Sequence, residues 1–280
     1  MKIWIIIGGL AVSCSCLAQY STGFENSDGY TTGSVIGQNG WYLPVTGSTP
    51  ASVEAYSGNS GGFVADPNGG SQFLEEANNG AALARASHAV NFSSGANWSV
   101  SMDLAVNSTT ASGQTAGTNV GSLSLETYGT DDSFISENVW DNATTRTSWG
   151  LQLETANAAG VASGLVSPGS QFDKLLVNHW YRETLDFSFT TNLVTYLSLT
   201  DLSNSNTVSM NLTGDYLSGG ATSTLALPSG IRLFGGGNNI NGNQMGWDNV
   251  SVQPQAVPEP APVLCLLLGV VGIAGLRRKV

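Results

Sequence analysis

The sequence predicts an all-β protein, an antiparallel β-sandwich, and three observations support this prediction. Apolar and polar residues alternate over several short stretches, which is the pattern of strands with one buried and one solvent-facing side. Only 10% of the 280 residues are charged, whereas glycine is abundant with 35 residues, a profile that fits an extracellular β-rich domain. No stretch between the two ends of the chain has an amphipathic helical period of convincing length.

The N-terminal part of the domain is the least regular. Short strand candidates at residues 22–24, 53–56 and 63–65 are separated by clusters of Gly, Asn and Pro, which mark turns and loops. Residues 77–86 have some helical propensity, but Gly80 and the surrounding strand patterns favour a loop and a strand.

The centre of the chain has the clearest alternation. Residues 98–106, 122–126 and 148–154 carry apolar side chains at every second position, so each is predicted to be a half-buried strand. The predicted inward residues are Trp98, Val100, Met102, Leu104 and Val106, then Leu123 and Leu125, then Trp149, Leu151 and Leu153.

A meander of three strands is predicted next. Residues 180–189 and 193–200 form a hairpin with a polar turn, and a second polar turn at 201–206 leads into the third strand. Residues 231–234 and 247–252 are the predicted closing strands, so the sandwich domain is expected to span residues 19–252.

The N-terminus is predicted to be a secretory signal peptide, residues 1–18. Lys2 precedes an apolar run, and small residues lead to a cleavage site after Ala18. Lipidation at Cys14 is the less favoured alternative, because Ala11 stands where a larger aliphatic residue is usual.

The C-terminus is predicted to be a membrane anchor. A Pro-rich linker at 253–260 precedes an apolar segment at 261–276, and a basic tail at 277–280 follows. Sixteen apolar residues in a helix span roughly 24 Å, slightly less than a hydrocarbon core of ~30 Å. The basic tail is expected on the cytoplasmic side, which leaves the domain outside the inner membrane.

This tail resembles the PEP-CTERM sorting signal of bacterial exported proteins. The resemblance rests on the order of its three parts at the extreme C-terminus: the V-P-E-P motif, the apolar segment and the basic cluster. The matching residues are Val257, Pro258, Glu259 and Pro260, then Arg277, Arg278 and Lys279. It implies processing by exosortase, a membrane-bound protease or transpeptidase-like enzyme, in bacteria that make exopolysaccharide.

The domain more faintly resembles jelly-roll modules of the concanavalin A-like (lectin/glucanase) type. The resemblance rests on residues 23–25 (Gly-Phe-Glu), 37–41 (Gly-Gln-Asn-Gly-Trp), 180–182 (Trp-Tyr-Arg) and 247–250 (Trp-Asp-Asn-Val). These motifs are short, so they imply a fold more than an activity.

Charge and cysteine content exclude several classes of function. All three cysteines lie in the terminal segments, so the domain uses no disulfide framework. Without the ends, five basic residues remain against nineteen carboxylates, a net charge near −14. Nucleic-acid binding is therefore not expected, because it requires a basic surface.

Catalytic motifs are missing from the sequence. Glucanases of this fold carry Glu-x-Asp-x-x-Glu or a near variant on one strand, and no such motif occurs. Alternation places Glu183 and Asp186 on opposite faces of a strand, and Glu137 with the Asp131–Asp132 pair is expected in a loop. The only histidines are His88 and His179, so a zinc site is poorly supplied.

Calcium is the ion that the sequence favours, because Asp131, Asp132 and Asp141 occur within a dozen residues. A solvated acidic loop is the simpler interpretation of this cluster and the preferred one. For Asp248 and Asn249, ion binding is weighed against anchoring through side-chain hydrogen bonds, and anchoring is preferred.

The candidate glycan-binding residues are one tryptophan and two asparagines. Most tryptophans are expected in the core, and Trp140 is the candidate surface platform for a sugar. Asn239 and Asn241, from the Gly/Asn-rich loop before the last strand, are the candidate polar partners.

The sequence thus predicts an exported protein of the cell envelope, outer surface or extracellular matrix. Its role is expected to be structural or adhesive, not enzymatic, with a weak affinity for glycans such as exopolysaccharide. The alternative is a divergent polysaccharide hydrolase on the same fold.

Overall fold

The computed structural model describes residues 19–77, 84–93, 96–109, 119–128, 131–142, 144–221, 227–235 and 242–255. The strands in this part of the chain are β1 (Tyr20–Thr22), β2 (Gly33–Ser34), β3 (Trp41–Tyr42), β4 (Thr49–Pro50), β5 (Ser52–Ala55), β6 (Gln72–Ala77), β7 (Ala84–Ala89), β8 (Asn97–Ser108), β9 (Asn119–Tyr128), β10 (Asp131–Trp140), β11 (Ser148–Ala156), β12 (Ala162–Val166), β13 (Leu175–Leu176), β14 (Trp180–Ser188), β15 (Leu193–Asp201), β16 (Asn206–Asn211), β17 (Gly230–Gly235) and β18 (Asn243–Pro254). Two short 3-10 helices, η1 (Asn26–Asp28) and η2 (Ser170–Phe172), complete the described elements.

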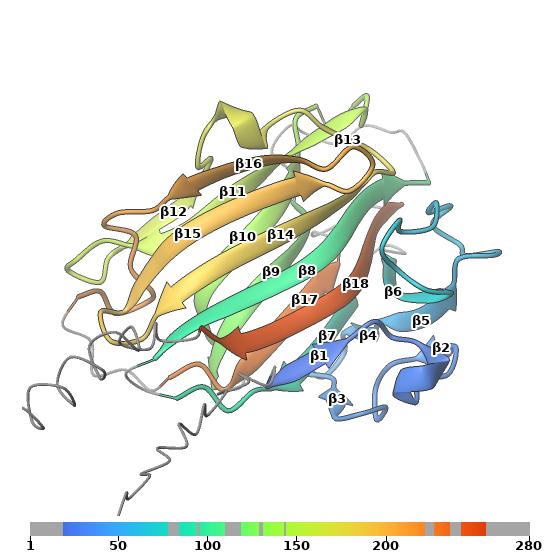
Figure 1. The fold of residues 1–280 in the computed structure, drawn as a ribbon, viewed down its shortest axis with the longest axis horizontal. Coiled ribbons are helices and arrows are strands. Elements are labelled where there is room, and N and C mark those ends of the chain that lie inside the picture. The colour runs from blue at the N-terminus through green and yellow to red at the C-terminus, as the bar shows by residue number, and fades with distance from the viewer. Residues whose placement is uncertain are drawn as a thin grey trace, which may run out of the picture. The chain divides into compact units, whose positions relative to one another are not determined.

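The strands form two sheets that pack face to face (Figure 1). The front sheet has the order β16-β15-β14-β8-β18-β6-β5-β2, with β1 also paired to β18. The back sheet has the order β12-β11-β10-β9-β17-β7-β3, with β13 beside β11 and β4 beside β7. Every described pairing is antiparallel except that of β4 with β7. The predicted antiparallel β-sandwich is therefore confirmed.

The core lies between the two sheets and follows the predicted alternation. In β8 the predicted inward residues Trp98, Val100, Met102, Leu104 and Val106 are at most 1% exposed. The predicted meander is β14, β15 and β16, which pair in sequence order. The closing strands β17 and β18 lie in different sheets, so the chain crosses the sandwich between them.

The side chains of Glu183 and Ser136 form a hydrogen bond between the two sheets, inside the core. Glu183 of β14 points inward and is 1% exposed, and it accepts a hydrogen bond of 2.5 Å from the Ser136 Oγ of β10 in the opposite sheet. Asp186 lies on the outer side of β14, so the prediction of opposite faces for these two carboxylates is confirmed.

Two local predictions are wrong. Residues 63–65 are not a strand but part of the connection between β5 and β6. Asp131, Asp132 and Glu137 do not lie in a loop, because they belong to β10. This strand lacks the usual alternation of apolar inward and polar outward residues: its inward positions include Ser136 and Asn138, whereas Ile135 faces outward.

The predicted signal peptide, V-P-E-P motif, apolar segment and basic tail lie outside the described residues. Among the residues that are described, no helix is long and apolar enough to cross a membrane.

Candidate functional site

The outer face of the front sheet carries three rows of side chains, each crossing the same five strands. Antiparallel register aligns them from β18 through β8, β14 and β15 to β16. The first row is Asp248, Asp103, Arg182, Thr200 and Thr207; the second is Ser251, Ser101, Thr184, Ser198 and Ser209; the third is Gln253, Ser99, Asp186, Tyr196 and Asn211. Five strands span about 19 Å at the usual spacing of about 4.8 Å.

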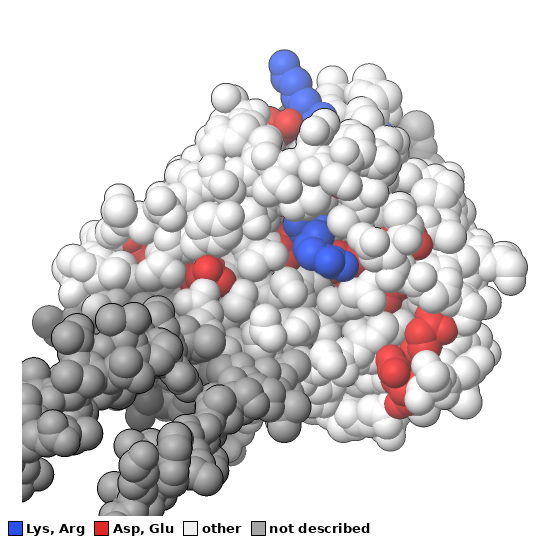
Figure 2. Space-filling model, viewed as in Figure 1, with Lys and Arg blue, Asp and Glu red and all other residues white. Residues whose placement is uncertain are grey.

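The middle row consists of hydroxyl side chains alone, and most of its members are accessible. Ser101, Thr184 and Ser251 are half-buried, Ser209 is exposed, and Ser198 is 8% exposed. Figure 2 shows this side of the molecule as largely uncharged, with one group of basic atoms near its middle and acidic atoms around that group. The face is therefore a polar but mostly neutral surface.

Arg182 is the basic residue of these rows. Its Nε and Nη2 atoms each donate a hydrogen bond of 2.6 Å to the carboxylate of Asp103, which is completely buried. The Arg182 side chain is 40% exposed. A bidentate pair fixes the plane of the guanidinium group, so its remaining N–H groups have a defined direction toward solvent.

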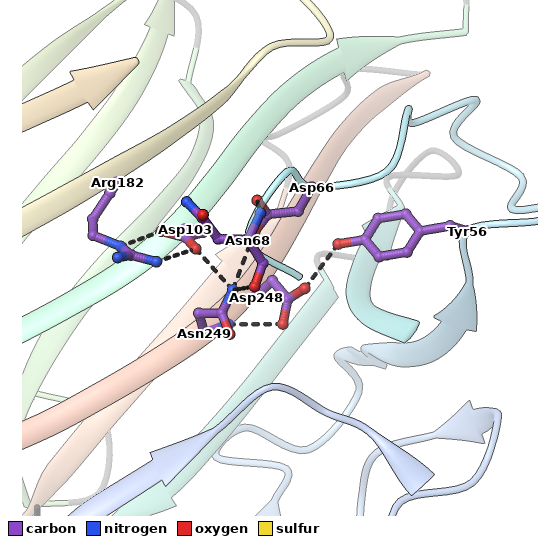
Figure 3. Close-up of polar contacts among 7 residues, drawn as sticks. All are labelled: Tyr56, Asp66, Asn68, Asp103, Arg182, Asp248 and Asn249. Carbon is purple, nitrogen blue, oxygen red and sulfur yellow. Dashed lines mark hydrogen bonds and ion pairs between the residues drawn. The ribbon is translucent and has the colours of Figure 1, made fainter. Parts of the chain in front are cut away.

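The residues 56–71 connect β5 to β6 and lie beside the first row; we call them the 56–71 loop. Asn249 joins this loop to the sheet: its Nδ2 donates to Asp103 Oδ2 at 2.8 Å, to the Asn68 carbonyl at 3.2 Å and to Asp66 Oδ2 at 3.3 Å (Figure 3). Asn249 has a left-handed backbone, φ 46°, within a bulge of β18. The bulge turns this amide toward the loop.

Tyr56, the first residue of the 56–71 loop, joins the network through Asp248. Its hydroxyl donates a hydrogen bond of 2.8 Å to Asp248 Oδ2 (Figure 3). Burial raises the pKa of Asp248 to about 8, and burial likewise raises the pKa of Asp66 to about 7. At neutral pH a large share of both carboxyl groups is therefore protonated, which reduces repulsion among three neighbouring aspartates around one arginine.

Further contacts hold the 56–71 loop against the sheet. Glu25 accepts hydrogen bonds from the backbone N–H groups of Ser71 and Gln72, both at 2.8 Å. Trp180 packs against Phe63 of the loop and donates from Nε1 to the Val64 carbonyl at 2.8 Å. The anchoring interpretation of Asp248 and Asn249 thus describes their contacts, although they anchor the loop as much as the last strand.

The outer face of the back sheet has a second polar network. Arg232 of β17 forms an ion pair with Asp132 of β10 and lies 3.6 Å from Glu126 of β9. Glu126 also accepts hydrogen bonds of 3.1 Å from the Tyr42 hydroxyl and from Ser87 Oγ. Most of these groups are paired with one another, although Arg232 Nε is buried without a hydrogen bond among the described residues, and such mutual pairing is typical of a structural network.

Two carboxylates beside this network are less well satisfied. Glu137 and Glu154 face outward from neighbouring strands, and the register pairs Glu137 with Gln152 and Ile135 with Glu154. They are therefore diagonal neighbours, whose Cα atoms are typically about 7–8 Å apart. Burial, with a smaller contribution from the charge of Glu154, raises the pKa of Glu137 to about 7. Glu154 lines a small cavity of about 70 Å³.

The predicted site residues do not come together. Trp140 is 1% exposed, so it is not a surface platform; its Nε1 donates to Asn243 Oδ1 at 2.9 Å. Asn239 and Asn241 lie outside the described residues. Asp132 lies near the start of β10 and Asp141 directly follows its end, so the two residues are about 30 Å apart at ~3.3 Å per residue. Asp131, Asp132 and Asp141 therefore do not form one calcium site.

Within the part of the chain that the structure describes, no group of three or more His, Cys, Asp or Glu side chains is placed to hold a metal ion. The three aspartates around Arg182 belong to a hydrogen-bonded network with Arg182, Asn249 and Tyr56. The rows and the Glu137–Glu154 pair were both missed by sequence reasoning, because each depends on strand register.

No protein-family model matches the chain, and no curated protein matches it. Solved structures with a similar fold include the basic winged bean lectin with Tn-antigen (8% identity, TM-score 0.45, 84% of this chain and 97% of that chain). Another is lectin UEA-II complexed with galactose (9% identity, TM-score 0.45, 85% and 98%). A third is a protein of unknown function from Shewanella oneidensis MR-1 (14% identity, TM-score 0.47, 91% and 96%). These similarities concern the general sandwich architecture alone.

Proposed function

We propose that this chain is an exported, non-catalytic protein that binds polysaccharide on the outer face of its front sheet. The observation that carries the proposal is the set of three aligned rows, with a middle row made only of hydroxyl side chains. A repeating, largely neutral surface with donors and acceptors about 4.8 Å apart suits a polymer that is itself covered with hydroxyl groups.

Two side chains of this face offer specific contacts to a sugar. The exposed N–H groups of Arg182 are oriented by the buried Asp103, so they can donate to ring or hydroxyl oxygens without reorganising. Tyr196 in the third row is half-buried and offers an aromatic ring for contact with a sugar face. Individual hydrogen bonds to such a surface are weak because water competes for them, so the affinity is expected to come from several contacts along one chain.

The binding proposal is tested with purified protein on a panel of soluble polysaccharides, by affinity electrophoresis. The double variant Ser101→Ala and Thr184→Val removes two neighbouring hydroxyl groups of the middle row and leaves the shape nearly unchanged. Loss of two hydrogen bonds of about 1 kcal/mol each predicts roughly 10- to 30-fold weaker binding. Thr144→Val, in an exposed turn after β10, is the matched control and is expected to bind as the wild type does.

Binding by wild type and double variant with equal affinity would place the site elsewhere. Absence of binding to every polysaccharide at high protein concentration would contradict the proposal as a whole.

Export and sorting are proposed from the sequence of the two ends. We infer that the chain passes through the inner membrane, is anchored there by residues 261–276, and is processed by exosortase before delivery to the envelope or matrix. The order of the V-P-E-P motif, apolar segment and basic tail supports this. Deletion of residues 257–280 is expected to change the distribution of the protein between cell and matrix, measured by fractionation and immunoblotting. An unchanged distribution would refute the sorting proposal.

Polysaccharide hydrolysis is the second candidate, and the Glu137–Glu154 pair is the specific observation in its favour. A carboxyl group with a pKa of about 7 beside a more exposed carboxylate is the arrangement of a general acid and its partner in glycosidases. Release of reducing ends by wild type, abolished by Glu137→Gln but retained by the neighbouring Gln152→Ala, would establish this activity. No release from a polysaccharide that the protein binds would exclude it for that polymer and leave the binding proposal standing.

A further inference from the structure

A polar pocket lies at the outer side of the front sheet where β4, β5 and β6 meet. Its volume is about 160 Å³, and its lining is Thr49, Pro50, Ser52, Glu54, Ser60, Glu75 and Ala77. The lining supplies two carboxylates and three hydroxyl groups but no Lys, Arg or His. The pocket is therefore negatively charged, and the polar side chains that line it carry oxygen atoms only.

Glu75 is the central side chain of this pocket, and one of its oxygens is held in place. Its Oε1 accepts a hydrogen bond of 2.6 Å from Ser60 Oγ, and backbone N–H groups of Ser60 and Gly61 also favour its ionised form. A side chain at position 61 would be crowded, because a Cβ there would lie 2.6 Å from the Phe63 ring and 3.1 Å from Glu75 Oε1. The carboxylate is thus oriented before any ligand arrives.

The other oxygen of Glu75 has no partner among the residues that the structure describes. Glu75 is 3% exposed, and its Oε2 is buried there without a hydrogen bond. An unsatisfied buried carboxylate oxygen is costly, and native proteins normally pair such an atom with a donor or a cation. This unpartnered oxygen is the observation that points to a ligand.

A second carboxylate stands next to it. The register of β5 and β6 places Ser52 directly opposite Glu75, so Glu54 is the diagonal neighbour of Glu75 on the same face. Burial is the main cause of the raised pKa of Glu75, and the charge of Glu54 raises it further. The two groups repel one another unless a positive charge lies between them.

We propose that this pocket binds one calcium ion through Glu54 and Glu75, with hydroxyl groups of the lining and water completing its coordination. Calcium prefers oxygen ligands in a flexible arrangement of six to eight, and carboxylates with hydroxyls and water meet this preference. A soft or imidazole-preferring metal finds no ligand of its kind in this lining. The site is distinct from Asp131, Asp132 and Asp141, and it does not depend on the polysaccharide proposal.

The test is calorimetric titration of chelator-treated full-length protein with CaCl₂, together with thermal unfolding at the same calcium concentrations. Wild type is expected to bind one ion with a dissociation constant on the order of 10⁻⁴ M, as extracellular calcium modules do, and to show a rise in Tm with added calcium. Glu75→Gln is expected to abolish both effects.

Glu54→Gln is the second variant, because Glu54 is only half-buried and we expect its substitution by an isosteric amide to preserve the fold. It is expected to weaken calcium binding at least tenfold, and it decides the question should Glu75→Gln fail to fold. Asp186→Asn, on the outer face of β14, is the control and should bind as wild type does. Wild-type affinity in Glu54→Gln, no calcium response in wild type, or an equal response to Mg²⁺ would each overturn the assignment.

Discussion

Replacing Glu183 by glutamine is expected to make the domain less sensitive to pH. Glu183 lies in the core between the sheets, where it accepts a hydrogen bond from Ser136 Oγ. Burial raises its pKa from 4.5 to about 7, and the Ser136 hydrogen bond opposes this only in part. The folded protein therefore holds a proton on this group over a pH range in which the unfolded chain has released it.

The sign and size of the effect follow from this difference. Because the folded state binds more protons than the unfolded state, the free energy of unfolding falls as pH rises through the interval from 4.5 to about 7. A shift of this size corresponds to about 3 kcal/mol, of which about 2–3 kcal/mol is lost between pH 5 and pH 9. Glutamine is neutral throughout and has nearly the same shape, so Glu183→Gln lacks this loss.

Urea unfolding followed by tryptophan fluorescence at pH 5 and pH 9 measures the effect in both proteins. The variant is expected to be more stable than wild type by about 2 kcal/mol at pH 9 and nearly equal to it at pH 5. Other carboxyl groups with raised pKa values, such as Asp66 and Asp248, are present in both proteins and cancel in the comparison. Asp186→Asn, on the outer side of the same strand, controls for the loss of one negative charge. A stability difference between wild type and Glu183→Gln that is the same at both pH values would refute the reasoning.

Three further substitutions probe the packing and the loop. Asn249→Ala removes three hydrogen bonds and puts alanine in a left-handed conformation, so a loss of about 2–4 kcal/mol and faster proteolysis within the 56–71 loop are expected. Tyr56→Phe removes the hydrogen-bond donor to Asp248 and so raises the pKa of that carboxyl group further. In urea unfolding, the loss of stability caused by this substitution should be about 1 kcal/mol greater at pH 9, where Asp248 is ionised, than at pH 6. An equal loss at both pH values would contradict this. Gly121→Ala brings a Cβ to within 2.5 Å of the Phe234 carbonyl oxygen, so it should lower the free energy of unfolding by about 1–3 kcal/mol. Gly23→Ala is its control: the new Cβ would lie 3.4 Å from its nearest neighbouring atom, so little effect is expected.

Alternation predicted the sandwich because most strands have apolar inward positions, and it failed where buried polar groups satisfy each other. In β10 the inward Ser136 donates to Glu183, and the inward Asn138 donates to the Gly121 carbonyl at 3.2 Å. The inward face holds Phe134 and Trp140 together with the polar Ser136 and Asn138, and Ile135 faces outward, so the apolar period-two pattern of this strand is broken. Glu183, the partner of Ser136, lies 47 residues further along the chain in β14, and Gly121 lies 17 residues earlier in β9, so a short sequence window around β10 contains neither partner.

The candidate site was beyond prediction for a related reason. Sequence identifies which side chains of one strand share a face, but it does not state which residue of the next strand lies opposite. The row of five hydroxyls exists only because Ser251, Ser101, Thr184, Ser198 and Ser209 are aligned by four separate registers. Trp140 illustrates the converse: residue type suggested a sugar platform, but the ring is inward and Arg146 lies over it at 5.9 Å.

The short motifs on which the resemblance to concanavalin A-like modules rests have contacts that explain their presence without a ligand. Glu25, Trp180 and Asn249 come from three of these motifs, and each contacts the 56–71 loop or the residue that follows it. Trp180 lies over Gly246, where a Cβ would come within 2.9 Å of its ring, and Phe63 of the loop packs against the same ring and covers it. Without this cover the large ring would be an exposed hydrophobic patch. The motifs therefore position the loop. Under the proposed function, ligand preference should depend on the second and third rows, because Asp248 and Asp103 of the first row are buried and take part in the loop contacts.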